Sequence, residues 1–143
     1  MEIRTDLHLG DCKEKLKLME ESSVDLIVTS PPYADQRKDT YGGIHHDKYV
    51  EWFLPISEQL LRVLKPTGTF ILNIKEKVVD GERSTYVMEL ILEMRKQGWL
   101  WTEEFIWHKK TVIRVNGQTV FVIHGKDFYN LTRTVNSTCI KRK

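Results

Sequence analysis

Short apolar runs alternate with amphipathic helical patterns along the first 110 residues, and few folds are compatible with that alternation. Residues 24–28 and 69–74 are nearly continuous apolar runs, which is typical of strands buried on both faces. Residues 100–107 alternate between two kinds of side chain, as a strand with two different faces does. The order strand, helix, strand, helix, strand predicts an α/β layered fold with a mostly parallel sheet.

Three segments have the apolar spacing of helices. The first is short and covers residues 12–20. The longest begins at Asp47, a suitable N-cap, and runs to about Leu64, and Pro55 inside it should kink or split the helix. The third is closed by Gly98 as its C-cap.

Composition predicts a single-domain globular protein. With 143 residues, of which 41% are hydrophobic and 29% charged, the chain can bury one core and is neither collagen-like nor wholly disordered. No apolar run approaches the roughly 18 residues of a membrane span, and residues 1–6 lack a signal-peptide core, so we expect a cytoplasmic protein with no membrane partner. Cys12 and Cys139 have no metal-binding or disulfide spacing, and His45 and His46 read as part of a solvated loop, so no metal site is expected.

The charge distribution changes near residue 110. The net charge is +2, but residues 111–143 hold six basic residues and one acid, a net of +5, whereas the first 110 residues hold 16 basic and 19 acidic residues, a net of −3. We therefore divide the chain into residues 1–110 and a tail, residues 111–143. In the tail, residues 112–115 and 119–123 flank Asn116-Gly117, which predicts a hairpin.

A polar loop, Thr29-Ser30-Pro31-Pro32-Tyr33, follows the first apolar run. It would lie at the carboxyl end of a strand, where α/β sheets bind ligands. Taken alone, Ser-Pro-Pro also starts ordinary turns and extended segments, and the tyrosine could simply cover the sheet edge. The setting favours a functional loop, because the strand itself follows Gly10-Asp11-Cys12.

Four stretches, in this order, resemble the β-class amino-methyltransferases of DNA, in which the catalytic motif precedes the cofactor motif. They are Leu9-Gly10-Asp11-Cys12, residues 23–33 with the Ser-Pro-Pro-Tyr loop, Leu64-Lys65-Pro66-Thr67-Gly68-Thr69, and Phe105-Ile106-Trp107-His108-Lys109. The resemblance covers about residues 6–110. It implies a partial Rossmann-like fold that uses S-adenosyl-L-methionine, double-stranded DNA as the partner, and a place in a restriction-modification system.

The resemblance assigns the catalytic role to Ser30, Pro31, Pro32 and Tyr33. The exocyclic amino nitrogen of a base is a poor nucleophile, because its lone pair is delocalised into the ring. Two acceptors, the Ser30 hydroxyl and the Pro31 carbonyl, would turn both N–H bonds and free the lone pair toward the sulfonium methyl. The prolines hold their carbonyls rigidly and offer no N–H, and Tyr33 would stack on a base swung out of the duplex.

The resemblance also implies the cofactor contacts and the target base. Asp11 would accept a hydrogen bond from the adenine or ribose of S-adenosylmethionine, and its local alternative is to cap the first helix. Cys12 and Ser30 complete the implied cofactor contacts, although Cys12 alone reads as a small packing residue. Ser at position 30, rather than Asp or Asn, favours a cytosine-N4 enzyme over an adenine-N6 enzyme.

Four other residues could contribute to DNA recognition. Trp107 and Lys109 match a late family motif that lines the base pocket, and the alternative for Trp107 is a place in the core. Arg37 and Lys38 lie in a polar loop over residues 34–43 and could contact phosphates, with an ordinary exposed loop as the alternative.

The Asp-Pro-Phe-x-Gly-Ser-Gly segment that builds the rest of the family's cofactor site does not occur in this sequence. We therefore expect a truncated methyltransferase that, as this chain alone, is inactive and binds S-adenosylmethionine weakly or not at all. Two alternatives from other classes are a non-catalytic DNA-binding fragment and an RNA amino-methyltransferase.

Back-translation suggests why the pattern changes near residue 110. Read one base upstream, the codons of residues 111–131 permit Asn-Ser-Tyr-Pro-Gly-Lys-Trp-Ser-Asn-Arg-Phe-Arg-Asp-Ser-Trp-Glu-Arg-Leu-Leu-Gln-Phe, which resembles the family after its Trp-x-Lys motif. The hypothesis is that residues 111–143 come from the family's own coding sequence in a shifted frame. Such a tail would not be selected to pack on the sheet and should be poorly ordered or arbitrarily folded. A genuinely divergent tail is the alternative.

Overall fold

The structure, a computed structural model, describes the backbone of residues 3–36, 43–108, 112–115, 118–121 and 134–142. Its elements, in chain order, are α1 (Cys12–Lys17), β1 (Val24–Thr29), α3 (His46–Val63), β2 (Leu64–Ile74), β3 (Val78–Val79), β4 (Glu82–Arg83), α4 (Tyr86–Gln97), β5 (Trp99–His108), β6 (Val112–Val115), β7 (Gln118–Phe121) and β8 (Thr134–Arg142). Within these ranges, no helix is both long and apolar enough to cross a bilayer.

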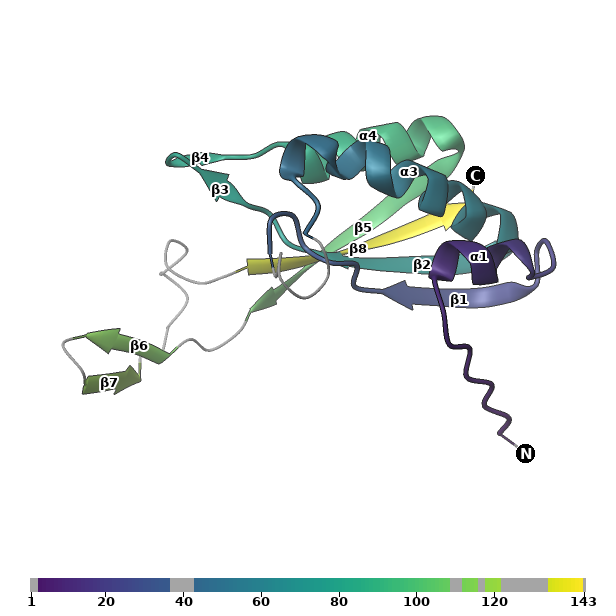
Figure 1. Ribbon diagram of the computed structural model, residues 1–143, viewed down its shortest axis with the longest axis horizontal. Helices are drawn as coiled ribbons and strands as arrows, with labels where there is room; N and C mark the ends of the chain where they lie inside the picture. Colours follow the sequence, from purple (N-terminus) through teal and green to yellow (C-terminus); the bar gives the residue numbers. More distant parts are fainter. Residues whose placement is uncertain (1–2, 37–42, 109–111, 116–117, 122–133, 143) are drawn as a thin grey trace.

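The main sheet has four strands in the order β1-β2-β8-β5 (Figure 1). Strands β1 and β2 pair in parallel, and β8 pairs antiparallel with both β2 and β5. Three of the four strands therefore run in the same direction, and only β8 runs against them. This confirms the α/β class and the mostly parallel sheet, with one antiparallel strand inserted.

Helices α3 and α4 pack together over one face of this sheet, and α1 lies beside α3 (Figure 1). The buried face of α3 repeats every three or four residues and consists of Tyr49, Phe53, Ile56, Ser57, Leu60 and Val63. It joins alternate residues of β2, the buried face of α4 and Trp99 in one core. Ser57, a polar residue with no exposed surface, accepts a hydrogen bond from Trp99 Nε1 at 2.9 Å and donates to Gln97 Oε1 at 2.7 Å. The core therefore contains no unpaired polar group at this point.

The helix boundaries differ from prediction at one end and agree at another. Helix α3 starts at His46 with His45 as N-cap, so the prediction of Asp47 as the cap is wrong by two residues. Pro55 lies inside one continuous helix, and the expectation of a split is wrong. Its side chain is exposed, so water can reach the backbone carbonyl that the missing N–H leaves without a helical partner. Gly98 ends α4 with φ of 110°, as predicted, because a left-handed C-cap favours glycine.

Strand β1 is not buried on both faces as predicted. Leu26 and Val28 are 55% and 63% exposed, while Ile27 between them packs against the core. By register and alternation, Leu26 and Val28 share a sheet face with Leu100 and Phe105 of β5, which are 42% and 54% exposed. We call these four residues the open face. The described helices cover only the opposite face. Residues 24–28 carry apolar side chains on both faces, which predicted full burial, but the strand is covered on one side.

Part of the tail joins the sheet. Strand β8 lies between β2 and β5, with Leu72 opposite Thr138 and Glu104 opposite the same threonine. The segment Thr134–Arg142 therefore pairs within the sheet, and the reading-frame hypothesis for the tail stays a prediction. The predicted hairpin is confirmed as the antiparallel pair β6–β7, in which Val115 faces Gln118.

Candidate active site

The Ser30–Tyr33 loop leaves the carboxyl end of β1 directly after Thr29, which lies opposite Leu72 of the parallel strand β2. The Ser30 hydroxyl is exposed and lies within hydrogen-bond distance of the Tyr33 hydroxyl, 3.3 Å away. Pro31 is buried, Pro32 is exposed and Tyr33 is half-buried. The loop thus turns back on itself at the sheet edge where α/β folds bind ligands.

A cavity of about 720 Å³ lies beside this loop, between α1, the end of β1 and α3. It brings together five of the residues predicted for the site, namely Asp11, Cys12, Ser30, Pro31 and Pro32. The other wall is mainly apolar and comes largely from α3, with Trp52, Phe53, Ile56 and Leu60. Tyr33 does not line the cavity and is linked to it through the hydrogen bond with Ser30.

Asp11 and Cys12 lie at the start of α1. The Asp11 carboxylate accepts a hydrogen bond from the Lys13 amide at 2.8 Å, so its local alternative as a helix cap is confirmed. Both residues are exposed. The interpretation of Cys12 as a packing residue is wrong, because Leu16 is the residue of this short helix that enters the core.

The buried residue Tyr49 on α3 contacts the loop. Its side chain is fully buried, and its hydroxyl donates a hydrogen bond to the Pro32 carbonyl at 2.8 Å. Burial raises the pKa of Tyr49 well above the ordinary value, so the hydroxyl stays protonated and keeps donating. Sequence reasoning missed this residue, although Tyr49 stands four residues before Phe53 on the helical stripe.

The Asp35 carboxylate, two residues after Tyr33, is the centre of a polar cluster. Its side chain is 6% exposed and lies 2.6 Å from Lys77 Nζ and 2.8 Å from His46 Nδ1. The His46 amide also donates to it at 3.2 Å. Burial alone would raise the pKa of Asp35, but the hydrogen bonds from Lys77 and His46 outweigh it and hold the pKa below its ordinary range. The expectation of a solvated loop is therefore wrong for His46, whose side chain is 15% exposed.

The same cluster has the ligand types of a metal site, but its one buried carboxylate is already neutralised by a lysine. Ligand atoms of Asp35, His45 and His46 all lie within 4.8 Å of one another. Lys77, however, already neutralises the carboxylate at 2.6 Å. A divalent cation would have to displace this ammonium group, so the donor set fits an ion pair better than a metal ion.

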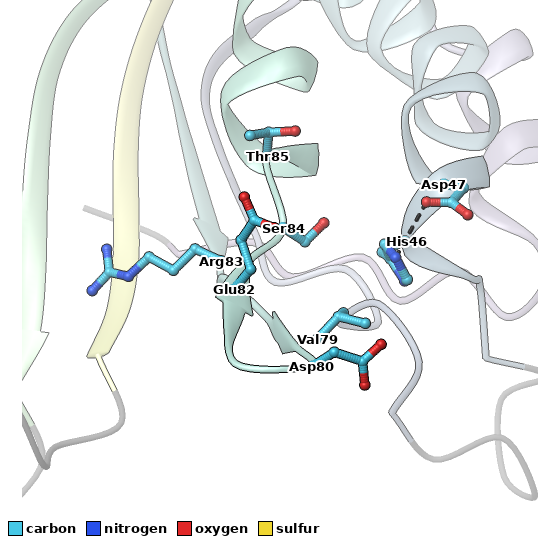
Figure 2. A pocket seen from close by; sticks show the side chains of 8 residues that line it. All are labelled: His46, Asp47, Val79, Asp80, Glu82, Arg83, Ser84 and Thr85. Carbon is cyan, nitrogen blue, oxygen red and sulfur yellow. Dashed lines mark ion pairs between the residues drawn. The ribbon is translucent and has the colours of Figure 1, made fainter.

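A second cavity, of about 400 Å³, lies between the start of α3, the β3–β4 hairpin and the start of α4 (Figure 2). Its lining includes three carboxylates, on Asp47, Asp80 and Glu82. The Arg83 side chain extends away from His46 and Asp47 (Figure 2). This arrangement repels phosphate, so the cavity is unsuited to the DNA backbone.

The side chains of the four predicted recognition residues lie outside the described part of the structure. Trp107 belongs to β5 by its backbone, but its side chain lies outside the described part of the structure. Lys109, Arg37 and Lys38 lie outside the described residues altogether.

Comparison with known proteins identifies the family. The family model for N6/N4 methyltransferases, described as "DNA methylase", matches residues 24–137. Type II methyltransferase M.PvuII of Proteus hauseri is 34% identical over 104 residues, which are 71% of this chain and 31% of that protein. M.HpaI of Haemophilus parainfluenzae is 40% identical over 68 residues, 46% of this chain and 21% of that protein.

Solved structures agree with this assignment. A PvuII DNA methyltransferase described as cytosine-N4-specific superposes with a TM-score of 0.71 at 28% identity, covering 95% of this chain and 48% of that chain. The fold alone is shared with the protein TTHA0409 of Thermus thermophilus in complex with S-adenosyl-L-methionine, at a TM-score of 0.62, 23% identity, and coverage of 95% of this chain and 52% of that one.

The chain spans about a third of the length of M.PvuII and about half of the solved chains it matches. The family match begins in β1 and continues past residue 110 into β8, so it includes part of the tail that sequence patterns alone do not connect with the family. A match over residues 24–137 covers most of the 143 residues. The chain therefore belongs to the DNA methylase family, the N6/N4 amino-methyltransferases of DNA.

Proposed function

We propose that the protein to which this chain belongs transfers a methyl group from S-adenosyl-L-methionine to the N4 amino group of a cytosine flipped out of double-stranded DNA. The observation that carries the proposal is the position of the Ser30–Tyr33 loop at the end of β1, beside a cavity that Asp11 and Cys12 also line. The enzyme would serve a restriction-modification system, as the names of its Type II relatives suggest.

The cavity beside the loop fits the cofactor of this family. Its volume of about 720 Å³ lies within the roughly 300–1,000 Å³ of small-molecule sites. Trp52 and Phe53 offer an apolar wall for an adenine ring, and the exposed Asp11 carboxylate offers an acceptor for a ribose hydroxyl or amino group. Cys12 and Ser30 would complete the contacts. When bound, S-adenosylmethionine supplies a methyl group on a positively charged sulfonium sulfur.

The loop offers the acceptors that an amino nitrogen needs. Tyr49 occupies the Pro32 carbonyl, whereas no described residue donates to the Pro31 carbonyl. The Pro31 carbonyl and the Ser30 hydroxyl could then each accept one N–H of the target amino group, which would direct its lone pair toward the methyl group. Tyr33, half-buried beside them, would stack on the flipped base.

The choice of cytosine rests on two observations. Position 30 carries Ser, and a relative with 28% identity and a TM-score of 0.71 is described as cytosine-N4-specific. An adenine-N6 enzyme would use the same kind of acceptors, so the product must be measured.

A chimera tests the proposal. The 104 matched residues of M.PvuII would be replaced by those of this chain, and the product incubated with labelled S-adenosylmethionine and either duplex DNA or RNA. Digestion to nucleosides should yield N4-methylcytosine from DNA. If the product is N6-methyladenine, the target base is adenine and not cytosine. Methylation of RNA alone would support an RNA enzyme. A chimera that folds and binds the cofactor but methylates nothing would contradict the proposal.

A further inference from the structure

We propose that Asp35 is a positioning residue that holds Tyr33 in place for stacking on the target base. This inference rests on the proposed function, because it assigns a role within the same site. It starts from the Asp35–His46–Lys77 cluster, in which a carboxylate with only 6% exposure lies two residues beyond Tyr33.

Tyr33 lies between two anchors of the backbone. On its N-terminal side, the buried Tyr49 hydroxyl donates to the Pro32 carbonyl at 2.8 Å. On its C-terminal side, the Asp35 amide donates to the Ile44 carbonyl at 2.8 Å, and the Asp35 side chain binds His46 and Lys77. The anchors come from Ile44 just before α3, from α3 itself and from Lys77 after β2, which is 42 residues from Asp35.

The backbone of Asp35 adopts a conformation that favours a short polar side chain. Its φ of 55° lies in the left-handed region, where Asp and Asn occur more readily than residues without a short polar side chain. The Gln36 amide closes a turn by donating to the Tyr33 carbonyl at 3.2 Å. A change at Asp35 that removes the polar group would therefore loosen the turn that contains Tyr33.

The charge of Asp35 is matched by its surroundings. Lys77 contacts it from the segment after β2, and His45 and His46 contact it from the start of α3. Asp47 contacts the same two histidines from the outside, at 3.4 Å and 3.2 Å, but its side chain is 72% exposed. Asp47 is therefore a matched control, because it has the same chemistry near the same histidines and its contacts described here do not reach the loop.

Asp35 acts on the base site and not on the cavity proposed for the cofactor. Asp11 and Cys12 belong to α1, and none of the contacts of Asp35 described above involves that helix. A loosened Tyr33 would misplace the base relative to the methyl group, and misplacements of about 1 Å can cost on the order of 100-fold in rate. Cofactor affinity should hardly change.

The first test measures kinetics in the M.PvuII chimera. Asp35→Ala should lower kcat about 10- to 100-fold and leave the dissociation constant of S-adenosylmethionine within about twofold. Asp35→Asn should recover part of the loss, because it keeps the backbone preference and a hydrogen-bonding group. Asp47→Asn should match the parent. Equal loss of kcat and cofactor affinity in Asp35→Ala, or no loss at all, would overturn the proposal.

The second test uses the 143-residue chain and needs no activity. In hydrogen–deuterium exchange, Asp35→Ala should speed exchange at the amides of residue 35, Gln36 and His46 at least about tenfold more than at the amides of α4, which report only the change in global stability. Unchanged exchange at the loop would refute the positioning role even in an active chimera. If the parent chimera is inactive while Asp35→Ala loosens mainly the loop, the proposed function is wrong, but Asp35 still holds the loop in place. If exchange rises by the same factor in the loop and in α4, Asp35 supports the whole fold and the specific proposal is wrong.

Discussion

The two faces of the main sheet differ in what covers them. Helices α3 and α4 cover one face (Figure 1). Phe70, Leu72 and Trp99 on that face are almost completely buried. On the open face, Leu26 and Val28 of β1 remain more than half exposed. Both faces carry apolar side chains, so hydrophobicity along a strand indicates what a fold is able to bury. It does not indicate what covers the strand in this chain.

The site belongs to the boundary between these two environments. The Ser30–Tyr33 loop leaves β1, whose open face is exposed, but Tyr49 of α3 donates to the Pro32 carbonyl and His46 of α3 binds Asp35, two residues after the loop. The covered layer therefore supplies the rigidity, and the exposed strand supplies the residues proposed for chemistry. Functional sites depend on such support, because small displacements of reacting groups cost rate.

The largest effect on stability is expected at Trp99. Trp99→Ala removes a side chain with 1% exposure and the Nε1–H that donates a hydrogen bond to Ser57. The free energy of unfolding should therefore fall by about 3–5 kcal/mol. The measurement is urea denaturation followed by circular dichroism. Leu100→Ser, the next residue on the opposite face, is the control and should change little. Similar losses for both variants would remove the distinction between the faces.

A medium effect with a pH dependence is expected at Asp35. The folded-state pKa lies below the ordinary 3.8, so the carboxylate stabilises the fold fully above the unfolded-state pKa and loses this contribution as pH falls through the folded-state value. Asp35→Asn should lower the free energy of unfolding by about 1.5–3 kcal/mol at pH 7, the usual strength of hydrogen bonds to charged groups. Denaturation at several pH values should show the gap to the parent narrowing below about pH 4. A gap that widens on acidification would contradict the ion-pair account.

The smallest effect is expected on the open face. Val28→Ser should change the free energy of unfolding by no more than about 0.5 kcal/mol, since 63% of the valine is already exposed. It should also reduce self-association at high concentration in analytical ultracentrifugation, because exposed apolar patches promote contacts between molecules. A loss above about 2 kcal/mol would mean that this face is buried in solution.

Local sequence patterns predicted the elements well and the contacts between them poorly. The helix closed by Gly98 and the strand before Ser30 follow from periodicity and turn chemistry alone. The Asp35–Lys77 pair joins residues 42 positions apart, and the Tyr49 partner is a backbone carbonyl, so neither leaves a pattern in the sequence. The position of β8 between β2 and β5 is likewise a long-range pairing that no local signal specifies.

The reading-frame hypothesis for residues 111–143 concerns the gene and stays a prediction. Sequencing should show that the frame one base upstream encodes the family pattern after Lys110 and continues to a Gly-rich cofactor motif. A stop codon in that frame within these residues, or no such motif further on, would refute it. The contribution of β8 to the sheet would then belong to an authentic, divergent tail.

The most direct test of the central claim separates the base site from the cofactor site. In the M.PvuII chimera, Tyr33→Ala should lower methyl transfer about 10- to 100-fold, in line with roughly 1–3 kcal/mol for stacking on one base, and leave S-adenosylmethionine affinity nearly intact. Asp11→Ala should weaken cofactor binding first, as measured by calorimetry. If Tyr33→Ala methylates DNA as fast as the parent chimera, the Ser30–Tyr33 loop is not the base site and the account is contradicted.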